Sequence, residues 1–430
     1  MSGAGDTADI RGNVEGFDVD RFLNSLEPIG WKLGLERMEM LSEELGRPQD
    51  SYATIHVVGT NGKSSVSRMI AAICEAHGHR AGCSVSPHLA RWSERVVVSG
   101  EELPELFSAC VRQAAEAAAR VNSRLDGEQV TQFELSAAAA FLTLAEAGVE
   151  IAAIEAGLGG RLDATNSIHS MATVLTSIGL DHTEYLGETE TGIASEKLAV
   201  LRPGTTLVLG PVSAEVRELA RKAAADRGCG LVEVDPERPG DPEASAAAGR
   251  GPGGFQRVNF SVATVAAACY LGEIVPGRAA EAVAGMVIHG RLEQLDDDPL
   301  TLADVAHNPA GAHALASSLP EITGPGPVIG VIGVLAGKDA PGMISELAGS
   351  LDYAVFTGLP PAALAAWGRP GASAWDPEEL RRIAGELGLK GETAPTPAAA
   401  LKRARAFARR RGGAVIITGS HFLLAPGEES

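Results

Sequence analysis

The sequence has few basic residues relative to acidic ones, and it has no long apolar run. Its 36 Lys and Arg against 55 Asp and Glu give a formal net charge of −19. This balance excludes a broad nucleic-acid-binding face, which needs clustered positive charge. Small anionic ligands stay open, because a few local lysines and arginines suffice for them. Since no uninterrupted apolar run reaches the length of a bilayer span, we expect no membrane partner.

The cysteines are too scattered for a disulfide framework or a metal site. There are five of them, without metal-ligand spacing: Cys74, Cys83, Cys110, Cys229 and Cys269. Such an odd set is typical of a reducing compartment. The polar start "MSGAGDTADIRGNVEG" has no apolar core and is no signal peptide. We therefore expect a cytoplasmic protein in which residues 1–16 form a disordered tail.

The length and the pattern of the chain predict two α/β domains. A chain of 430 residues is too long for one ordinary core. Gly-punctuated apolar runs alternate with Ala-rich helical stretches, which is typical of α/β proteins. A Pro-, Gly- and Ala-rich stretch over 236–254 predicts a loop, followed by a helix over 260–273. A change of character near residue 289 divides the chain into domains 17–288 and 289–430.

One strand–loop–helix pattern predicts a phosphate site. In "IHVVGTNGKSSVSRMIAAICEAHG", an apolar run from Ile55 to Val58 meets a glycine loop that ends in Lys63 and Ser64. Glycines let backbone amides face phosphate oxygens, and the start of a helix favours the anion. Lys63 would pair with the phosphates, and Ser64 could bind Mg²⁺ or a phosphate oxygen. The alternative is a glycine turn with a surface lysine. The loop alone leaves a kinase, a hydrolase, a ligase and a regulatory switch open.

Further motifs favour one of these classes. They follow the loop in this order: "SVSPHLARWSERV", "IEAGLGGRLDATN", "TSIGLDHTEYLG", "SEKLAVLRPG", "GGFQRVN", "GRLE", "ADVAHNPAG", "GVLAGKD" and "ITGS". Over residues 20–423 the chain resembles the folylpolyglutamate synthase and dihydrofolate synthase family of the Mur ligase superfamily. The resemblance implies an α/β fold with a P-loop ATPase domain and a smaller Rossmann-like domain, and an active site in the cleft between them.

The resemblance also implies an activity. Members of the family use ATP to convert the carboxylate of dihydropteroate or of a folate into an acyl phosphate, which the amino group of L-glutamate then attacks. A carboxylate is a poor electrophile, and its phosphorylation brings anions together that cations must offset. The implied partners are therefore small molecules alone: ATP with Mg²⁺, L-glutamate and a pteroate or folate. A monomer is expected on the same ground.

The resemblance assigns the metal and catalytic residues. Ser86, Glu155 and His182 match the Mg²⁺ ligands, and Lys197 matches a lysine that is carbamylated in family members and ligates a second Mg²⁺. Glu155 and His182 follow strands, where ligand sites of α/β sheets gather. A solvated helix lysine is the alternative for Lys197, and a structural role is the alternative for His182. The catalytic set is then Lys63, Glu155, His182 and Lys197.

The remaining site residues are assigned in the same way. The expected ATP contacts are Thr60, Asn61, Gly62, Lys63, Ser64, Asn259, Arg291 and Asp304. The expected acceptor contacts are Thr131, Gln132, Phe133, Glu134, Leu162, Asp163 and Ala164. For Gln132 and Phe133 an ordinary place at the start of a helix is the alternative. His307 and Asn308 lie close to Asp304 in the sequence.

Some residues depart from the family pattern and leave the substrate open. Ser64 stands where the family has a third glycine, Phe255 replaces a histidine, Val305 replaces a glycine and His421 replaces an apolar residue. Two other functions therefore stay open: a ligase of the same fold that joins a different carboxylate and amino acid, and a non-catalytic nucleotide-binding protein. The choice between dihydrofolate synthesis, polyglutamate extension and both also stays open.

Overall fold

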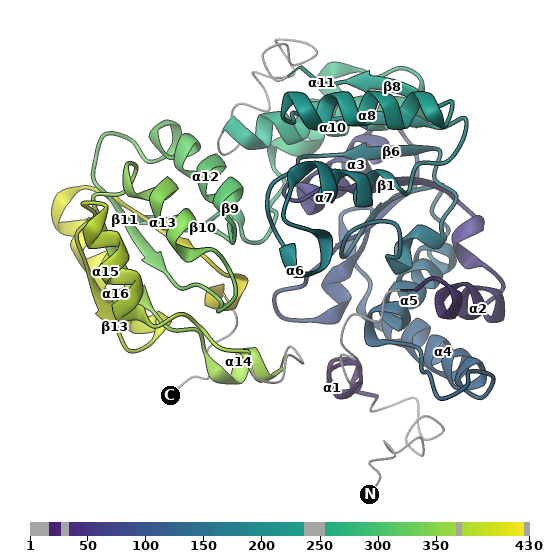
Figure 1. Cartoon of the computed structure of the whole chain (residues 1–430), viewed down its shortest axis with the longest axis horizontal. Helices are drawn as coiled ribbons and strands as arrows, with labels where there is room; N and C mark the ends of the chain where they lie inside the picture. The colour runs from purple at the N-terminus through teal and green to yellow at the C-terminus, as the bar shows by residue number, and fades with distance from the viewer. Residues whose placement is uncertain (1–16, 27–33, 236–253, 367–371, 425–430) are drawn as a thin grey trace, which may run out of the picture.

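The computed structural model describes residues 17–26, 34–235, 254–366 and 372–424. The predicted tail at 1–16 and the predicted loop up to residue 253 lie outside the described residues. Figure 1 shows two α/β units side by side, the first in purple to teal and the second in green to yellow. Within the described ranges, no helix combines the length and the apolar character required to cross a bilayer. All five cysteines are free thiols.

The first unit is built on a mixed sheet of eight strands in the order β4-β3-β2-β5-β1-β6-β7-β8. Strands β2 and β5 to β8 run parallel to β1. Near one edge, β3 is antiparallel to both of its neighbours, β2 and β4. The strands are β1 Ala53–Val58, β2 Ala81–Ser84, β3 Val96–Val98, β4 Glu101–Glu102, β5 Ile151–Glu155, β6 Ala172–Leu175, β7 Thr206–Leu209 and β8 Gly230–Glu233. The predicted α/β class is confirmed.

Helices cover both faces of this sheet because side chains alternate along each buried strand. Ile55 and Val57 of β1 pack against one group of helices, while Val58 packs against the other. The first group is α3 Lys63–Ala76, α10 Gly254–Leu271 and α11 Pro276–Ala284. The opposite face carries α2 Glu36–Glu44, α4 Pro104–Asn122, α5 Gln132–Glu146, α7 Glu190–Leu198 and α8 Ala214–Asp226, with the short α1 Val19–Ser25 and α6 Thr183–Leu186 nearby.

The second unit repeats the plan on a smaller scale. Its sheet of six strands has the order β13-β12-β11-β14-β10-β9, with β9 antiparallel at the edge. The strands are β9 Arg291–Asp297, β10 Leu300–Asp304, β11 Val328–Ile332, β12 Tyr353–Thr357, β13 Gly391–Ala394 and β14 Ala414–Thr418. One face packs on α12 Pro309–Ile322, α13 Ala340–Ala348 and α15 Pro377–Glu386, and the other on α14 Pro361–Ala366 and α16 Pro397–Arg411.

The helix predicted over 260–273 is displaced from the helix that forms. Helix α10 begins at Gly254 and ends at Leu271. The sequence hides this start because the Gly- and Pro-rich run reaches up to Gly254, whereas in the structure Phe255 packs on the core of the second unit. The first turns of α10 are therefore fixed by a tertiary contact. The predicted boundary near residue 289 lies in the connection between α11 and β9.

Strand β1 lies at the point where the strand order turns back. Its neighbours β5 and β6 come later in the chain and lie on either side of it. Loops that leave a parallel sheet at such a switch point diverge and leave a crevice at the carboxyl ends of the strands. The phosphate loop follows β1, Glu155 is the last residue of β5, and His182 lies in the segment after β6. The topology therefore explains why these distant segments meet.

Candidate active site

The phosphate loop has the geometry that an anion requires. Helix α3 begins at Lys63 after Gly62, whose φ is 83°, and no side chain in the described part of the chain caps this helix start. A Cβ on Gly62 would lie 2.6 Å from Oδ1 of Asn259. Glycine is therefore required both by the left-handed backbone and by the close approach of α10. The uncapped amides at the start of α3 and its dipole favour a bound phosphate.

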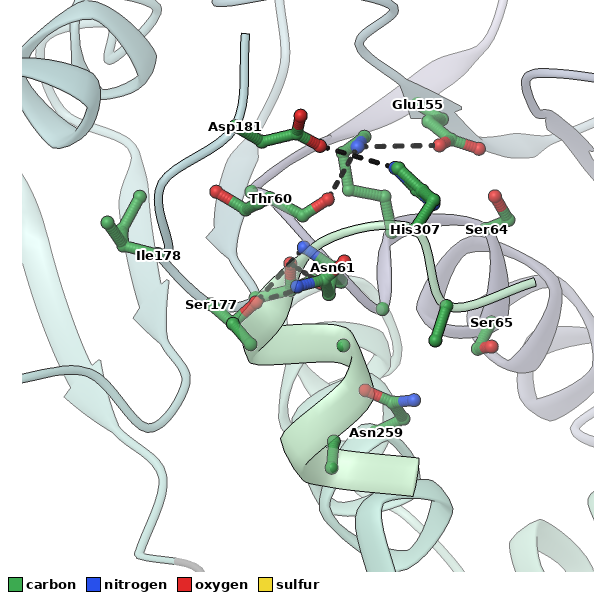
Figure 2. Close-up of a pocket in the computed structure, with 18 of the residues that line it drawn as sticks. Thr60, Asn61, Ser64, Ser65, Glu155, Ser177, Ile178, Asp181, Asn259 and His307 are labelled. Carbon is green, nitrogen blue, oxygen red and sulfur yellow. Dashed lines mark hydrogen bonds and ion pairs between the residues drawn. The ribbon is translucent and has the colours of Figure 1, made fainter. Parts of the chain in front are cut away.

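Neighbouring segments hold this loop in place. The Thr60 amide donates to the carbonyl of Ser177 at 2.8 Å, and the Asn61 amide donates to the hydroxyl of Ser177 at 3.1 Å. The Thr60 hydroxyl donates to the carbonyl of Gly179 at 3.1 Å. Figure 2 shows Ser177 and Asn61 joined by dashed lines. The loop is thus tied to the segment after β6 without using the amides at the start of α3.

One cavity of about 400 Å³ lies at the carboxyl end of β1 and between the two units. Every residue predicted to contact ATP or a metal lines it: Thr60, Asn61, Gly62, Lys63, Ser64, Ser86, Glu155, His182, Lys197, Asn259, Arg291 and Asp304. The chain therefore brings together, from both units, the twelve residues that the resemblance assigned to these two roles. Their roles stay predictions.

Glu155 is the buried anion of this cavity. Its side chain is 1% exposed, the Ser86 amide donates to its Oε2 at 2.9 Å, and the Lys63 ammonium lies 3.9 Å from its Oε1. Burial raises the pKa of Glu155, and the charge of Lys63 opposes that effect. Lys63 also donates to the carbonyl of Thr60 at 3.2 Å. The cation therefore lies between the carboxylate and the loop, where it can reach a phosphate.

His182 and Lys197 reach the cavity from different elements. His182 has a φ of 50° and lies at the start of α6, with Nε2 4.0 Å from Oδ1 of Asp181. Lys197 lies in the last turn of α7 and is buried. Burial, together with the charge of Lys63, lowers the pKa of Lys197 to about 7. A solvated surface position, the alternative for Lys197, does not describe a buried side chain.

The second unit contributes Arg291 and Asp304 from paired strands. Arg291 begins β9 and Asp304 ends β10, and the two residues are partners in the antiparallel register. The Asp304 carboxylate accepts the amides of Leu292 at 3.1 Å and Ala306 at 2.9 Å. Burial raises the pKa of Asp304, and the positive charge of Arg291 opposes this rise. Both residues are therefore held by the sheet rather than by a free loop.

Sequence reasoning gave no role to Asp181, which lies at the centre of the contacts between the units. His307, Asn308 and Lys338 of the second unit all donate to its carboxylate. Burial acts to raise the pKa of Asp181, but the hydrogen bond from His307 and the positive charges of His307 and Lys338 hold it well below its usual value. Figure 2 shows Asp181 and His307 pointing toward each other. The motifs "GLDH" and "AGKD" contain Asp181 and Lys338. The two residues are 157 positions apart in the sequence, so neither motif indicates that they pair.

The predicted acceptor-binding segments lie next to the main cavity, and most of their polar groups already have protein partners. Thr131 and Glu134 form a capping box at the start of α5, and Glu134 also pairs with Arg37 at 3.0 Å. Gln132 donates to the carbonyl of Leu23 at 2.6 Å. These contacts fit the alternative of an ordinary helix start for Gln132.

The other predicted acceptor residues are of two kinds: some are buried or bonded to the protein, and others are exposed or border a cavity. The Asp163 carboxylate accepts the amides of Leu158 and Thr165 and the Thr165 hydroxyl, and Ala164 is buried. By contrast, Leu162 is 38% exposed. The ring of Phe133 lines a small second cavity of about 10 Å³ that also borders Ser86 and Glu155. Among the predicted acceptor residues, Leu162 is therefore exposed and Phe133 borders the second cavity.

The donor set fits Mg²⁺ with one carboxylate and few protein ligands. Within the described ranges, no three His, Cys, Asp or Glu side chains cluster closely enough to hold a metal. The predicted set contains only two residues of these types, Glu155 and His182. Mg²⁺ commonly keeps several waters and uses one or two carboxylates with substrate phosphates. A site completed by a hydroxyl and by phosphate oxygens is consistent with this arrangement.

The fold and the cavity define a Mur ligase. Two family models match the chain: the Mur ligase middle domain over residues 57–229, and the Mur ligase glutamate ligase domain over residues 290–421. Within this class the chain belongs to the family of the dihydrofolate synthases and folylpolyglutamate synthases. The Mycobacterium tuberculosis protein named dihydrofolate synthase/folylpolyglutamate synthase is 33% identical over 358 residues, which cover 75% of this chain and 74% of that protein.

Solved structures give the same result. Mycobacterium tuberculosis folylpolyglutamate synthase, complexed with ADP and AMPPCP, matches with a TM-score of 0.81 at 29% identity over 94% of this chain and 95% of that one. Escherichia coli FolC in complex with DHPP and ADP matches with a TM-score of 0.78 at 26% identity over 94% of each chain. The predicted architecture, a P-loop ATPase domain of Mur ligase type followed by a smaller C-terminal domain, is confirmed.

Proposed function

We propose that this chain is an ATP-dependent ligase that joins L-glutamate to the carboxylate of dihydropteroate, of a folate, or of both. The observation that supports this most directly is the uncapped start of α3, which faces a buried carboxylate and an interdomain cavity. The relatives are named for these activities, and their structures hold ADP, AMPPCP or DHPP. The alternatives of another acid and of a non-catalytic binding protein are outcomes of the test below.

The first step would form an acyl phosphate on the acceptor. A carboxylate oxygen of the acceptor attacks the γ-phosphorus of ATP, and the bond from that phosphorus to the ADP oxygen breaks. Loop amides and Lys63 bind the phosphates, and Asn259, Arg291 and Asp304 hold the remainder of the nucleotide from both sides. Preorganised cations and amides stabilise the charge that gathers on the transferred group. ADP is the other product of this step.

The second step would form the amide. The amino group of glutamate attacks the acyl carbon, the carbon–oxygen bond to phosphate breaks, and the nitrogen loses a proton. Ser86, Glu155 and His182 would hold Mg²⁺, which when bound screens the phosphate oxygens and polarises the transferred group. Lys197, as a carbamate, would supply an oxygen ligand in place of its positive charge. We place the acceptor beside Phe133 and Leu162, where the remaining residues of the two acceptor segments shape the site.

The chain is proposed to act as a monomer, on the ground of its likeness to the family. The decisive experiment measures ADP release by the purified protein with MgATP, L-glutamate and either dihydropteroate or a reduced folate. Turnover with either acceptor supports the proposal and identifies the substrate. Turnover only with other acids supports the first alternative, and nucleotide binding without turnover supports the second.

The Lys63→Ala variant tests the site within this assay. Removing a cation that stabilises the transferred phosphoryl group costs about 10²- to 10³-fold in kcat. Omission of Mg²⁺ should abolish turnover of the unchanged protein. Lys222→Ala is the matched control, because Lys222 lies on the exposed part of α8 away from the cavity. A Lys63→Ala protein with the full rate would show that the reaction takes place elsewhere.

A further inference from the structure

The carboxylate of Asp181 joins the two units at the cavity. Its side chain is only 9% exposed. Oδ1 accepts the Lys338 ammonium at 2.5 Å and the His182 amide at 2.9 Å. Oδ2 accepts Nε2 of His307 at 3.2 Å and Nδ2 of Asn308 at 3.0 Å. Four donors on one carboxylate are a complete set of partners, so this position is built for an anion.

Three of the four donors belong to the second unit, and they come from two different elements. His307 and Asn308 lie at the start of α12, whereas Lys338 lies between β11 and α13. A single side chain of the first unit therefore fixes two loops of the second. The fourth donor is the amide of His182, so the same carboxylate also holds the turn that carries a predicted metal ligand.

A second contact links this arrangement to the phosphate loop. The side-chain amides of Asn61 and Asn308 form a reciprocal pair, with both hydrogen bonds at 3.1 Å. Asn308 thus bonds to Asp181 and to the loop at the same time. Because Asn308 also caps α12 through the amide of Gly311 at 2.8 Å, its position depends on the backbone of the second unit. Movement of α12 would disturb both contacts.

The contacts of His307 and Lys338 with the Asp181 carboxylate suggest a role for this residue. His307 lines the cavity, and Lys338, 15% exposed, shares the same carboxylate. The Lys338 ammonium and the Nε2 donor of His307 both need an acceptor at this place, and a buried charge without its partner is costly. We propose that Asp181 is a positioning residue: it holds His307 and Lys338 of the second unit against the phosphate loop, so that the cavity is complete before the acceptor reacts. This proposal rests on the ligase function proposed above.

The test uses the full chain and two independent measurements. The variants are Asp181→Asn, Lys338→Met and the double variant, and the control is Glu321→Gln. Glu321 pairs with Arg257 of α10 at 2.9 Å and also links the two units, but its side chain is 50% exposed. Small-angle X-ray scattering of the nucleotide-free protein gives the radius of gyration, and steady-state kinetics give kcat and the KM values for ATP and L-glutamate.

The expected result is a coupled loss in Asp181→Asn. We expect kcat to fall roughly 100-fold, the effect of removing one partner of a buried charge pair, and the radius of gyration to rise above that of the unchanged protein. Lys338→Met should act in the same direction, and the double variant should be no worse than the stronger single variant, since both break one interaction. Glu321→Gln should change kcat less than about twofold, as is typical of an exposed pair.

Two outcomes would overturn the proposal. If Asp181→Asn keeps either the kcat or the radius of gyration of the unchanged protein, Asp181 does not position the second unit for the reaction. The same holds if the effects of the two single variants add. If Asp181→Asn does not fold, Lys338→Met decides by the same criteria. Absence of turnover in the unchanged protein would instead contradict the ligase function, and the scattering of the variants would then decide alone whether Asp181 holds the units together.

Discussion

Two helix starts differ in how their polar groups are satisfied: the start of α3, which lines the cavity and is called here the nucleotide side, and the start of α5, called here the acceptor side after its predicted role. On the nucleotide side, the start of α3 has no side-chain cap within the described residues. On the acceptor side, the start of α5 has a complete capping box, and the Glu134 carboxylate also binds Arg37. The same element, a helix start, is therefore open to a ligand at α3 and satisfied by the protein itself at α5.

Because of this difference, the phosphate loop and the predicted acceptor segments give different kinds of information. Water or a ligand satisfies the amides of a helix start without a cap, and at α3 these amides line the cavity, which favours a ligand there. A capped and ion-paired helix start has no such need. The polar residues of the acceptor segments are then expected to affect the stability of the protein, while the residues of the phosphate loop are expected to affect ligand binding. Three substitutions test this contrast.

The largest expected effect concerns the buried ion pair on the acceptor side. Arg37→Met should lower the free energy of unfolding by about 3–5 kcal/mol, because it leaves the buried Glu134 carboxylate without its cation. The guanidinium and carboxylate side chains are 7% and 4% exposed. Denaturant unfolding followed by circular dichroism measures the change.

The control for this prediction is Arg120→Met. Arg120 binds Glu44 at 2.6 Å with an arginine that is 55% exposed, and loss of such a surface pair costs about 1 kcal/mol or less. Equal losses in the two variants would mean that the acceptor side does not depend on its buried pair. A stable Arg37→Met protein with a strongly raised KM for the acceptor would show instead that this side binds ligand directly.

A smaller effect is expected on the nucleotide side from Gly62→Ala. The left-handed backbone at φ 83° costs an alanine about 1–2 kcal/mol, and the new methyl group would also displace Asn259. We therefore expect both a modest loss of stability and weaker ADP binding in isothermal titration calorimetry. Gly78, at the other end of α3, has a φ of 93° and no atom within 4 Å of an added Cβ. Gly78→Ala should lose stability to a similar extent and bind ADP normally; weaker binding in both variants would refute the role of the loop.

The same contrast explains how much could be predicted from the sequence. The strand–loop–helix around Lys63 was recognisable because its chemistry is local: a glycine with positive φ, a buried strand and a helix start lie within a few residues. The α/β class followed from the alternation of apolar runs for the same reason. Resemblance to a family supplied Glu155, His182 and Arg291, which are far apart in the sequence. They meet only because β5 and β6 end, and β9 begins, near the same cavity.

What sequence reasoning missed depends on contacts between the units. Asp181 and Lys338 each lie in a quoted motif, but neither motif alone shows that one residue is the partner of the other. The start of α10 was missed because Phe255 is held by the core of the second unit. Conversely, Glu134 and Asp163 carry the residue type of a binding group, yet their carboxylates accept hydrogen bonds from the protein itself.

The smallest expected effect separates a cap from a ligand contact at Thr131. Its hydroxyl accepts the amide of Glu134 at 3.2 Å, so Thr131→Ala should cost about 1 kcal/mol of stability and leave the KM for the acceptor unchanged. Thr396 caps α16 in the same way, through the amide of Ala399 at 3.2 Å, and it does so in the second unit on a helix that packs on the other core. Thermal unfolding of both alanine variants should therefore show similar losses. A raised KM in Thr131→Ala alone would mean that the hydroxyl also contacts the acceptor, and the acceptor side would then resemble the nucleotide side more closely than its hydrogen bonds indicate.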